Sequence, residues 1–291
     1  MLLALDVGNT NMKLALYRLD VEPSPVLGPE FADWRSRPDI AAHWRLTTHR
    51  AQTVDEYGAL FINLLQMNSL SAADVTHIIV SSVVPPIDST LRRMCELYFH
   101  HQPLFVEPGI KTGMPVLVDN PTELGADRLA DAVAAFEKYG GPCIVVNFGT
   151  ATKFEVISGR GEYLGGAIAP GLGISAEALF ARAAKLGRID VKRPAKVIGT
   201  NTVGHLQTGL YYGYIGLVDG ILERIFEEMR GQEMGGAEPG THPRVIATGV
   251  QAHLVTPDSR CLKEFDDMLT LDGLRILFER NRAPRPRSRA H

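Results

Sequence analysis

Cysteine is scarce in the sequence, and its scarcity argues against two kinds of protein. The 291 residues include only Cys95, Cys143 and Cys261, and no two of them have CxxC spacing. An odd number of cysteines without paired spacing argues against a disulfide framework and against a zinc site. The nine histidines show no metal-ligand spacing either. We therefore expect ordinary core or surface roles for both residue types.

Long apolar runs and an excess of basic charge are also missing. No stretch of eighteen apolar residues occurs, so we expect no membrane span. The N-terminal segment MLLALDVGNT lacks the basic and apolar regions of a signal peptide, which predicts a cytoplasmic location. The net charge of −3 gives no broad positive field, so nucleic acid is not an expected partner.

One short segment differs from the rest in charge. From Arg280 onward, RNRAPRPRSRAH has five arginines and no acid, and subtracting these charges from −3 leaves −8 on residues 1–279. Residues 282–291 are predicted to be a disordered basic tail. A solvated chain end is favoured, and binding of an acidic partner or RNA remains open.

Two hairpin patterns recur along the chain. LLALD at residues 2–6 is followed by the turn VGNTN and the apolar run KLALYRL. The segment 143–158, CIVVNFGTATKFEVIS, repeats this layout at an offset of 141, with Gly8 over Gly149 and Asn9 over Thr150. Such a repeat predicts an internal duplication of one structural unit.

Strand and helix patterns alternate between and after the hairpins. Strands are predicted at 77–83, 103–106 and 245–248, and helices at 88–98, 122–139, 175–184, 202–229 and 271–281, with a loop at 231–243. This alternation is typical of an α/β protein. We expect two halves, residues 1–120 and 121–281, followed by the tail.

The turn after the first strand has residues suited to binding phosphate. Asp6 ends the strand and can hold Mg²⁺, Gly8 permits close approach of a phosphate oxygen, and Lys13 can neutralise phosphate charge. Backbone N–H groups and the side chains of Asn9 and Thr10 can face an anion. Taken alone, the turn could equally be an ordinary hairpin connection.

The second turn, NFGTAT at residues 147–152, strengthens the phosphate interpretation. Glycine and hydroxyl residues recur there, and two facing loops can hold a triphosphate from both sides. The chain has no GxxxxGK[ST] run and no GxGxxG after its first strand. It therefore predicts ATP binding of a kind that differs from the P-loop and Rossmann sites.

These two turns, with GADR at 125–128, resemble those of the type III pantothenate kinases, which belong to the superfamily of acetate and sugar kinases, Hsp70 and actin. The resemblance extends over nearly the whole chain to Asn281. It includes WRLTTHRAQTVDEYG at 44–58, NPTELGADR at 120–128, GGAIAPGLGISAEALFARAAKL at 165–186, IGTNTV at 198–203 and VIATG at 245–249.

The resemblance implies a fold and a reaction. The fold would be a duplicated ribonuclease H-like α/β fold, with two actin-like ATPase halves and a cleft between them. The reaction would transfer the γ-phosphoryl group of ATP to the primary hydroxyl of pantothenate, giving 4′-phosphopantothenate in the first step of coenzyme A synthesis. A homodimer is implied as well, because the acceptor site of this family is shared between subunits.

The resemblance also implies residue roles. Asp127 would be the general base, and Asp6 would hold Mg²⁺. ATP would be bound by Asp6, Val7, Gly8, Asn9, Thr10, Asn11, Met12, Lys13 and Thr150. Pantothenate would be bound by Gly125, Ala126, Asp127, Arg128 and Thr202.

The position of Asp127 supports its role as the base. A carboxylate in the first turn of a helix is favoured in its ionised form, and Arg128 beside it could pair with the carboxylate of the substrate. From GADR alone, a helix-start acid and a solvated arginine would be the simpler interpretation. The two phosphate turns reverse that preference.

The sequence departs from the family pattern in the second turn. Asn147 stands where aspartate usually helps to bind a monovalent cation, potassium or ammonium, and Lys153 stands where a small hydroxyl residue is usual. We hypothesise that the Lys153 ammonium replaces that cation. Val250 also replaces a glycine near the expected adenine site.

These departures leave a second function class open. A catalytically weak, nucleotide-binding accessory factor acting on transcription is the alternative, although Asp6, Asp127 and Arg128 favour the enzyme. An Hsp70-like or actin-like motor is disfavoured, because the chain lacks the appendage and subdomain lengths of those proteins.

Overall fold

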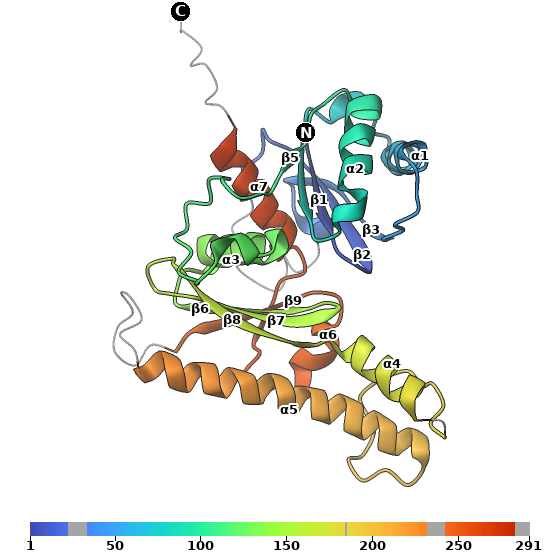
Figure 1. Cartoon of the computed structure of the whole chain (residues 1–291), viewed down its shortest axis with the longest axis vertical. Helices are drawn as coiled ribbons and strands as arrows, with labels where there is room; N and C mark the ends of the chain where they lie inside the picture. Colours follow the sequence, from blue (N-terminus) through green and yellow to red (C-terminus); the bar gives the residue numbers. More distant parts are fainter. Residues whose placement is uncertain (23–33, 184, 232–241, 283–291) are drawn as a thin grey trace, which may run out of the picture.

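The computed structural model describes residues 1–22, 34–183, 185–231 and 242–282. Most of the predicted 231–243 loop and all but Arg282 of the predicted tail lie outside these ranges. The described chain forms two five-stranded sheets, and between and around them lie helices (Figure 1).

The two sheets have the same strand order. The first is β3 (Ile40–Thr47), β2 (Asn11–Tyr17), β1 (Leu2–Val7), β4 (His77–Ser82) and β5 (Leu104–Phe105). The second, written in the matching direction, is β8 (Tyr163–Pro170), β7 (Ala151–Ile157), β6 (Cys143–Phe148), β9 (Arg244–Thr248) and β10 (Glu264–Phe265). In each, the first three strands are antiparallel and the others are parallel. The predicted duplication is confirmed.

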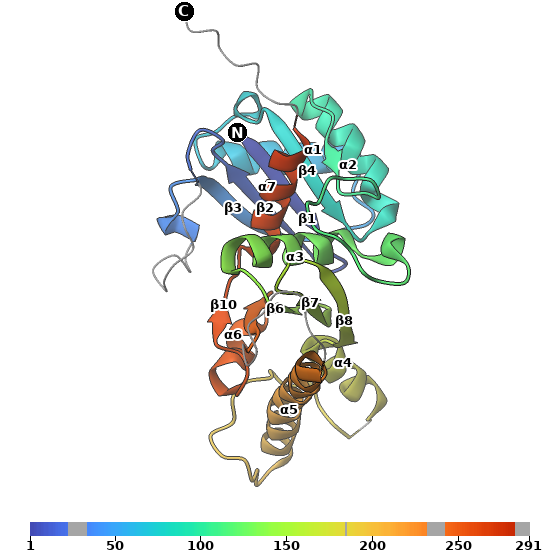
Figure 2. The same cartoon turned by 90° about the vertical axis from the view of Figure 1, so that its left-hand side faces the viewer.

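Helices cover both faces of each sheet (Figures 1 and 2). On the outer face of the first sheet lie α1 (Val54–Gln66) and α2 (Asp88–Met94), and α2 continues into a π-helical turn, Cys95–Phe99. On the outer face of the second sheet lie α5 (Thr202–Gly231) and α6 (Ala252–Val255), and α4 (Leu172–Arg182) follows β8. Because both faces are covered, β1 and β6 are almost continuously apolar and buried.

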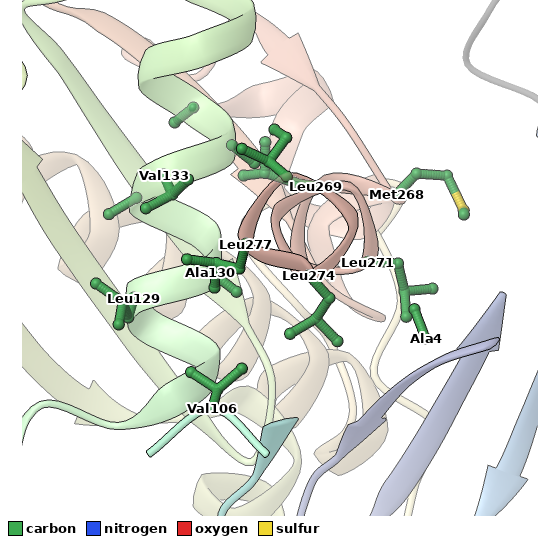
Figure 3. Packing of buried hydrophobic residues seen from close by; sticks show 14 of the residues in the cluster. Ala4, Val106, Leu129, Ala130, Val133, Met268, Leu269, Leu271, Leu274 and Leu277 are labelled. Atoms are coloured by element: carbon green, nitrogen blue, oxygen red, sulfur yellow. The ribbon is translucent and has the colours of Figure 1, made fainter. Parts of the chain in front are cut away.

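Two helices fill the space between the sheets. α3 (Ala126–Tyr139) and α7 (Leu269–Asn281) pack together, and Figure 3 shows Leu277 of α7 beside Ala130 of α3. A Cβ atom built on Gly273 would lie only 2.0 Å from the carbonyl oxygen of Ala130, so the two backbones are in close contact. The C-terminal helix α7 also contacts β1, β2 and β4, so it packs on the first sheet although it follows the second sheet in sequence.

A buried polar network ties α7 to the first sheet. The Tyr17 hydroxyl donates to Asp272 at 2.9 Å, and Arg37 donates to the other oxygen of Asp272 at 2.7 Å. Lys138 of α3 also contacts Asp272. Burial alone would raise the pKa of Asp272, but Lys138 and Arg37 hold it well below its usual value.

The predicted elements are present, with shifts at their ends. The helix expected at 122–139 begins only at Ala126, because a 3₁₀ turn, Pro121–Glu123, comes before it and Gly125 is extended. The helix expected at 88–98 is α-helical to Met94 and continues as a π-helix to Phe99. Strands β3 and β8 and helix α1 were not predicted. The remaining 3₁₀ turns are Trp34–Ser36, Ala72–Asp74, Pro85–Ile87 and Thr256–Asp258.

Candidate active site

Residues of both halves line one cavity of 410 Å³. From the first half come Asp6, Gly8, Asn9, Thr10, Asn11, Lys13 and Val83. From the second come Glu123, Gly125, Asp127, Arg128, Asn147, Gly149, Thr150, Ala151, Lys153, Ile168, Ile174, Gly249 and Val250. The structure thus brings the two predicted phosphate turns and the GADR segment to one cleft.

The two turns face each other and differ in length by one residue. In the first, the Gly8 N–H donates to the Asn11 carbonyl at 3.0 Å, and in the second the Gly149 N–H donates to the Ala151 carbonyl at 3.1 Å. The constant offset of 141 therefore fails beyond the glycines. The structural counterpart of Thr150 is Thr10, not Asn9, and the hydroxyls of Thr10 and Thr150 lie 2.8 Å apart.

The floor of the cleft repeats the same positions in each half. Asp6 pairs in register with Lys13 across the first hairpin, and Asn147 pairs with Lys153 across the second. On the neighbouring parallel strands, Ser81 is aligned with Asp6 and Thr248 with Asn147. The duplication has therefore kept a lysine and a hydroxyl in both halves, and has kept the acid only in the first.

Asp127 lies in the first turn of α3, with both oxygens engaged. Its Oδ1 accepts from the Arg128 N–H at 2.8 Å, and its Oδ2 accepts from the Lys153 ammonium. Burial opposes the charge on Lys153, but Asp127 and Asp131 outweigh that effect and raise the pKa of Lys153. Burial and the carboxylate of Asp127 raise the pKa of Asp6 to about 6. Charges of both signs are thus concentrated at the base of the cleft.

Asn147 contacts an acid that the sequence did not single out. Its Nδ2 donates to Asp131 Oδ2 at 2.6 Å, and Thr270 donates to Asp131 Oδ1 at 2.6 Å. Asp131 is fully buried, which raises its pKa to about 7. Its place one turn after Asp127 on α3 was the only signal of its role.

Arg128 is held in place by two partners. Its Nε donates to Glu155 at 2.8 Å, and its Nη2 donates to the Tyr163 hydroxyl at 2.8 Å. Glu155 is buried and also accepts from Tyr163. These contacts fix the guanidinium at the edge of the cleft before any substrate arrives.

Four predicted site residues do not line the cleft. The side chains of Val7 and Met12 are buried in the core of the first sheet and do not line the cleft. Ala126 lines a separate cavity of 380 Å³. Thr202 begins α5 and does not line the cleft within this chain. Glu123, two residues before Gly125, lines the cleft and was not predicted.

A further cavity of 460 Å³ is formed by residues adjacent in sequence to those of the cleft. It lies between α4 and the segment after β9, and it is lined by Leu172, Gly173, Ala176, Phe180, Gln251 and Leu254, together with Glu177 and residues 188–191. Ile174 and Val250 line the cleft itself. Its walls mix the apolar side chains of Leu172, Phe180 and Leu254 with the charged side chains of Glu177, Arg188 and Asp190, so it could hold a ligand that has both apolar and polar parts.

Comparison with known proteins decides the family. The model of the type III pantothenate kinase family matches residues 2–224. The type III pantothenate kinase of Koribacter versatilis is 56% identical over 291 residues, which cover 100% of this chain and 99% of that protein. That of Acidobacterium capsulatum is 49% identical over 288 residues, 99% of this chain and 98% of that protein. The chain belongs to the type III pantothenate kinase family.

This kinase uses ATP to phosphorylate pantothenate in coenzyme A synthesis. The accessory-factor alternative is not favoured, because relatives from 46% to 56% identical carry the kinase name.

Solved structures at low identity show the same fold. A putative Baf family transcriptional activator from Campylobacter jejuni superposes with a TM-score of 0.54 at 16% identity, covering 96% of this kinase and 98% of that chain. A putative 2-dehydro-3-deoxygalactonokinase from Sinorhizobium meliloti gives 0.52 at 10% identity, covering all of both chains. The fold is the predicted duplicated, actin-like ATPase fold.

The described residues of the kinase contain neither a candidate metal cluster nor a candidate membrane span. No group of three or more His, Cys, Asp or Glu side chains there could hold a metal. No helix there is long and apolar enough to cross a membrane.

Proposed function

We propose that Asp127 is the general base of this pantothenate kinase and that the ATP phosphates lie between the Gly8–Asn11 and Gly149–Ala151 turns. The observation that most directly supports this proposal is that both turns and Asp127 line one cavity. The acceptor hydroxyl oxygen attacks the γ-phosphorus, the bond to the β,γ-bridging oxygen breaks, and the hydroxyl proton passes to Asp127. In such a transfer, positioning and charge stabilisation supply most of the catalysis.

Asp6 is proposed to hold Mg²⁺ together with the phosphate oxygens. The residues around Asp6 fit a hard cation, because Asp6 and Thr10 line the cleft and have carboxylate and hydroxyl oxygens, whereas the amide oxygen of Asn9 accepts from Arg50 at 2.8 Å. A single protein carboxylate plus substrate phosphates is a common Mg²⁺ set, which agrees with the lack of a three-ligand cluster among the described residues. When bound, Mg²⁺ would neutralise charge that develops on the phosphates.

The adenosine is proposed to occupy the 460 Å³ cavity beside α4. Its apolar residues Leu172, Phe180 and Leu254 suit the faces of a purine, and Gln251 offers a polar group to its edge. Val250, which replaces the usual glycine, lines the phosphate cleft and adjoins this cavity in sequence.

We also propose that the Lys153 ammonium replaces the monovalent cation of the second turn. The Asn147 amide is engaged with Asp131, and Lys153 provides a positive charge beside Asp127 and Asp131. This arrangement supports activity without added potassium or ammonium ions. Steep activation by either ion would contradict it.

Pantothenate is proposed to bind at Gly125–Arg128, with Thr202 supplied by the second subunit of a homodimer. Thr202 lies off the cleft of its own chain, which is consistent with a shared site. Exposed apolar side chains lie on the same part of the chain and could pack in such an interface, namely Ile168, Ile174, Leu179, Val197, Ile198 and Val203. The division into halves near residue 120 stays a prediction.

The test is pantothenate-dependent ADP release by the purified protein, with Mg²⁺ and ATP in excess. Asp127→Asn keeps the shape of the side chain and removes the base, so we expect release to fall by about 10²–10⁴-fold. Asp119→Asn, an acid on the same segment that does not line the cleft, is the matched control. Equal activity of Asp127→Asn and the unsubstituted protein would overturn the role of Asp127.

A further inference from the structure

Lys153 and Lys13 are counterparts in the duplicated fold. Each stands on the second strand of its hairpin, opposite the last polar residue of the first strand, Asp6 for Lys13 and Asn147 for Lys153. Both side chains line the phosphate cleft and are mostly covered, with 9% of the Lys13 side chain and 15% of the Lys153 side chain exposed. The two lysines therefore reach the cleft from its two sides.

Their partners differ. Lys13 forms a long ion pair with Asp267, at 3.8 Å, and its charge also favours the ionised form of Asp6. Lys153 donates directly to Asp127, the proposed base. The ammonium of Lys153 therefore lies directly against Asp127, and the charges of Asp131 and Asp6 also favour it.

A bound triphosphate competes for that charge. Lysine is a point charge on a flexible four-carbon stem, so its ammonium can move between acceptors without backbone change. Lys153 stands two residues after Ala151 on one strand, and alternate residues of a strand share a face, so it points to the same side as the end of the second phosphate turn. Phosphate oxygens carry more negative charge than one carboxylate and are strong acceptors.

We propose that Lys153 is an exchangeable positioning residue that pairs with Asp127 in the nucleotide-free cleft and with the transferred phosphoryl group once ATP is bound. This inference rests on the proposed role of Asp127. Nucleotide binding then frees one oxygen of Asp127 for the acceptor hydroxyl. Binding of nucleotide and binding of pantothenate are then coupled: pantothenate binds the nucleotide complex more tightly than it binds the free protein.

The test measures pantothenate affinity by titration calorimetry on the full chain, with and without Mg²⁺ and a non-hydrolysable ATP analogue. A hydrogen bond to a charged group is worth about a tenfold change in affinity or more, so we expect at least about tenfold tighter pantothenate binding with the analogue. In Lys153→Met we expect the two affinities to agree within about twofold. Lys153→Arg, which keeps the charge, should keep the coupling.

The results separate this inference from the proposed function. Coupling below twofold in the unsubstituted protein, a measurement that needs no variant, would overturn it, and so would undiminished coupling in a folded Lys153→Met. Turnover of Lys153→Met should also fall by about 10-fold or more, because a cation at the phosphoryl group is lost. If Asp127→Asn is inactive while the ATP analogue still tightens pantothenate binding to Lys153→Met, only this inference fails. If Asp127→Asn is fully active, the proposed base fails first.

Discussion

The hydroxyls of Thr10 and Thr150 lie 2.8 Å apart, although the two residues are 140 positions apart in the chain. They join the tips of the two phosphate turns across the mouth of the cleft. A triphosphate placed between the turns must replace this contact with hydrogen bonds of its own. The pair is therefore a direct probe of the phosphate site.

Removing either hydroxyl should weaken ATP binding. Thr10→Val and Thr150→Val keep the shape of the side chain and remove a donor, so we expect each to raise the KM for ATP by about 5–10-fold, or about 1–1.5 kcal/mol. Because the two residues touch, the double variant should lose less than the product of the single effects. Steady-state kinetics with varied ATP, on the unsubstituted protein, the two single variants and the double variant, measure this double-mutant cycle. Fully multiplicative effects would mean that the two hydroxyls act on separate ligands.

Much of this site could be predicted from the sequence, and there are physical reasons why the rest could not. The spacing of apolar residues and glycines located both turns, because hairpins are local structures. The one-residue difference between the turns was missed, since two Gly/Thr turns align equally well with or without a gap at Asn9. Asp131 and its bond to Asn147 were missed because contacts between a helix and a strand leave no local pattern. The ion pair of Lys153 with Asp127 was missed for the same reason.

Gly171, between β8 and α4, should be irreplaceable because it packs against the second phosphate turn. A Cβ atom at this residue would lie 2.4 Å from the carbonyl oxygen of Thr150 and 2.5 Å from that of Gly149. Gly171→Ala must therefore displace the turn, and we expect the kcat/KM for ATP to fall by about 10²-fold, since small misplacements of a phosphate site are costly. Kinetics on the purified variant measure the loss.

The matched control is Gly209→Ala in α5, where a Cβ atom meets nothing within 4 Å. Alanine is the better helix former, so this variant should be as stable as the unsubstituted protein or more stable, by up to about 1 kcal/mol. Full activity of Gly171→Ala would show that the second turn tolerates displacement.

Asp272 should dominate the loss of stability in acid. Its pKa is held well below the usual value by Lys138 and Arg37, so the ionised form is stabilised by folding. That contribution is fully present above the pKa of the unfolded chain, near 3.9, and is lost as the pH falls further. Asp272→Asn removes the carboxylate that Lys138 and Arg37 share, although Lys138 keeps Asp266 and Arg37 keeps Asp39, and it should lower the free energy of unfolding by about 1.5–3 kcal/mol at pH 7.

Denaturant unfolding at pH 7 and pH 3.5 measures this effect. The difference between Asp272→Asn and the unsubstituted protein should shrink at the lower pH. Asp267→Asn is the control, because the Asp267 side chain is 30% exposed and its ion pairs are 3.6 and 3.8 Å long. It should cost less than about 1 kcal/mol. Equal costs for the two variants would contradict the role of the buried network.

Asn147→Asp should make stability depend on pH and on cations. The substitution removes the amide that donates to Asp131 and puts a second carboxylate 2.6 Å from a buried one. Asp131 already has a pKa raised to about 7, so one of the two acids must stay protonated or gain a cation. An acid whose pKa is raised by folding loses stability as the pH rises from its unfolded value through its folded value. We expect the free energy of unfolding of Asn147→Asp to fall by about 1–3 kcal/mol at pH 8, and by less at pH 6.

Thermal unfolding of Asn147→Asp in potassium chloride and in choline chloride at equal ionic strength tests whether the added carboxylate binds a cation. Potassium should restore part of the lost stability, because oxygens of two carboxylates then surround a position that Lys153 alone does not neutralise. Asn147→Ala also removes the donor but adds no charge, so it should show no potassium effect. Because the Asn147 amide helps to lower the pKa of Asp131, Asn147→Ala should also lose more stability at pH 8 than at pH 6, but by less than Asn147→Asp. If Asn147→Asp were as stable as the unsubstituted protein at both pH values, the contact between Asn147 and Asp131 would not be part of the folded site. If potassium and choline acted alike, Lys153 would already supply all the positive charge that this position can use.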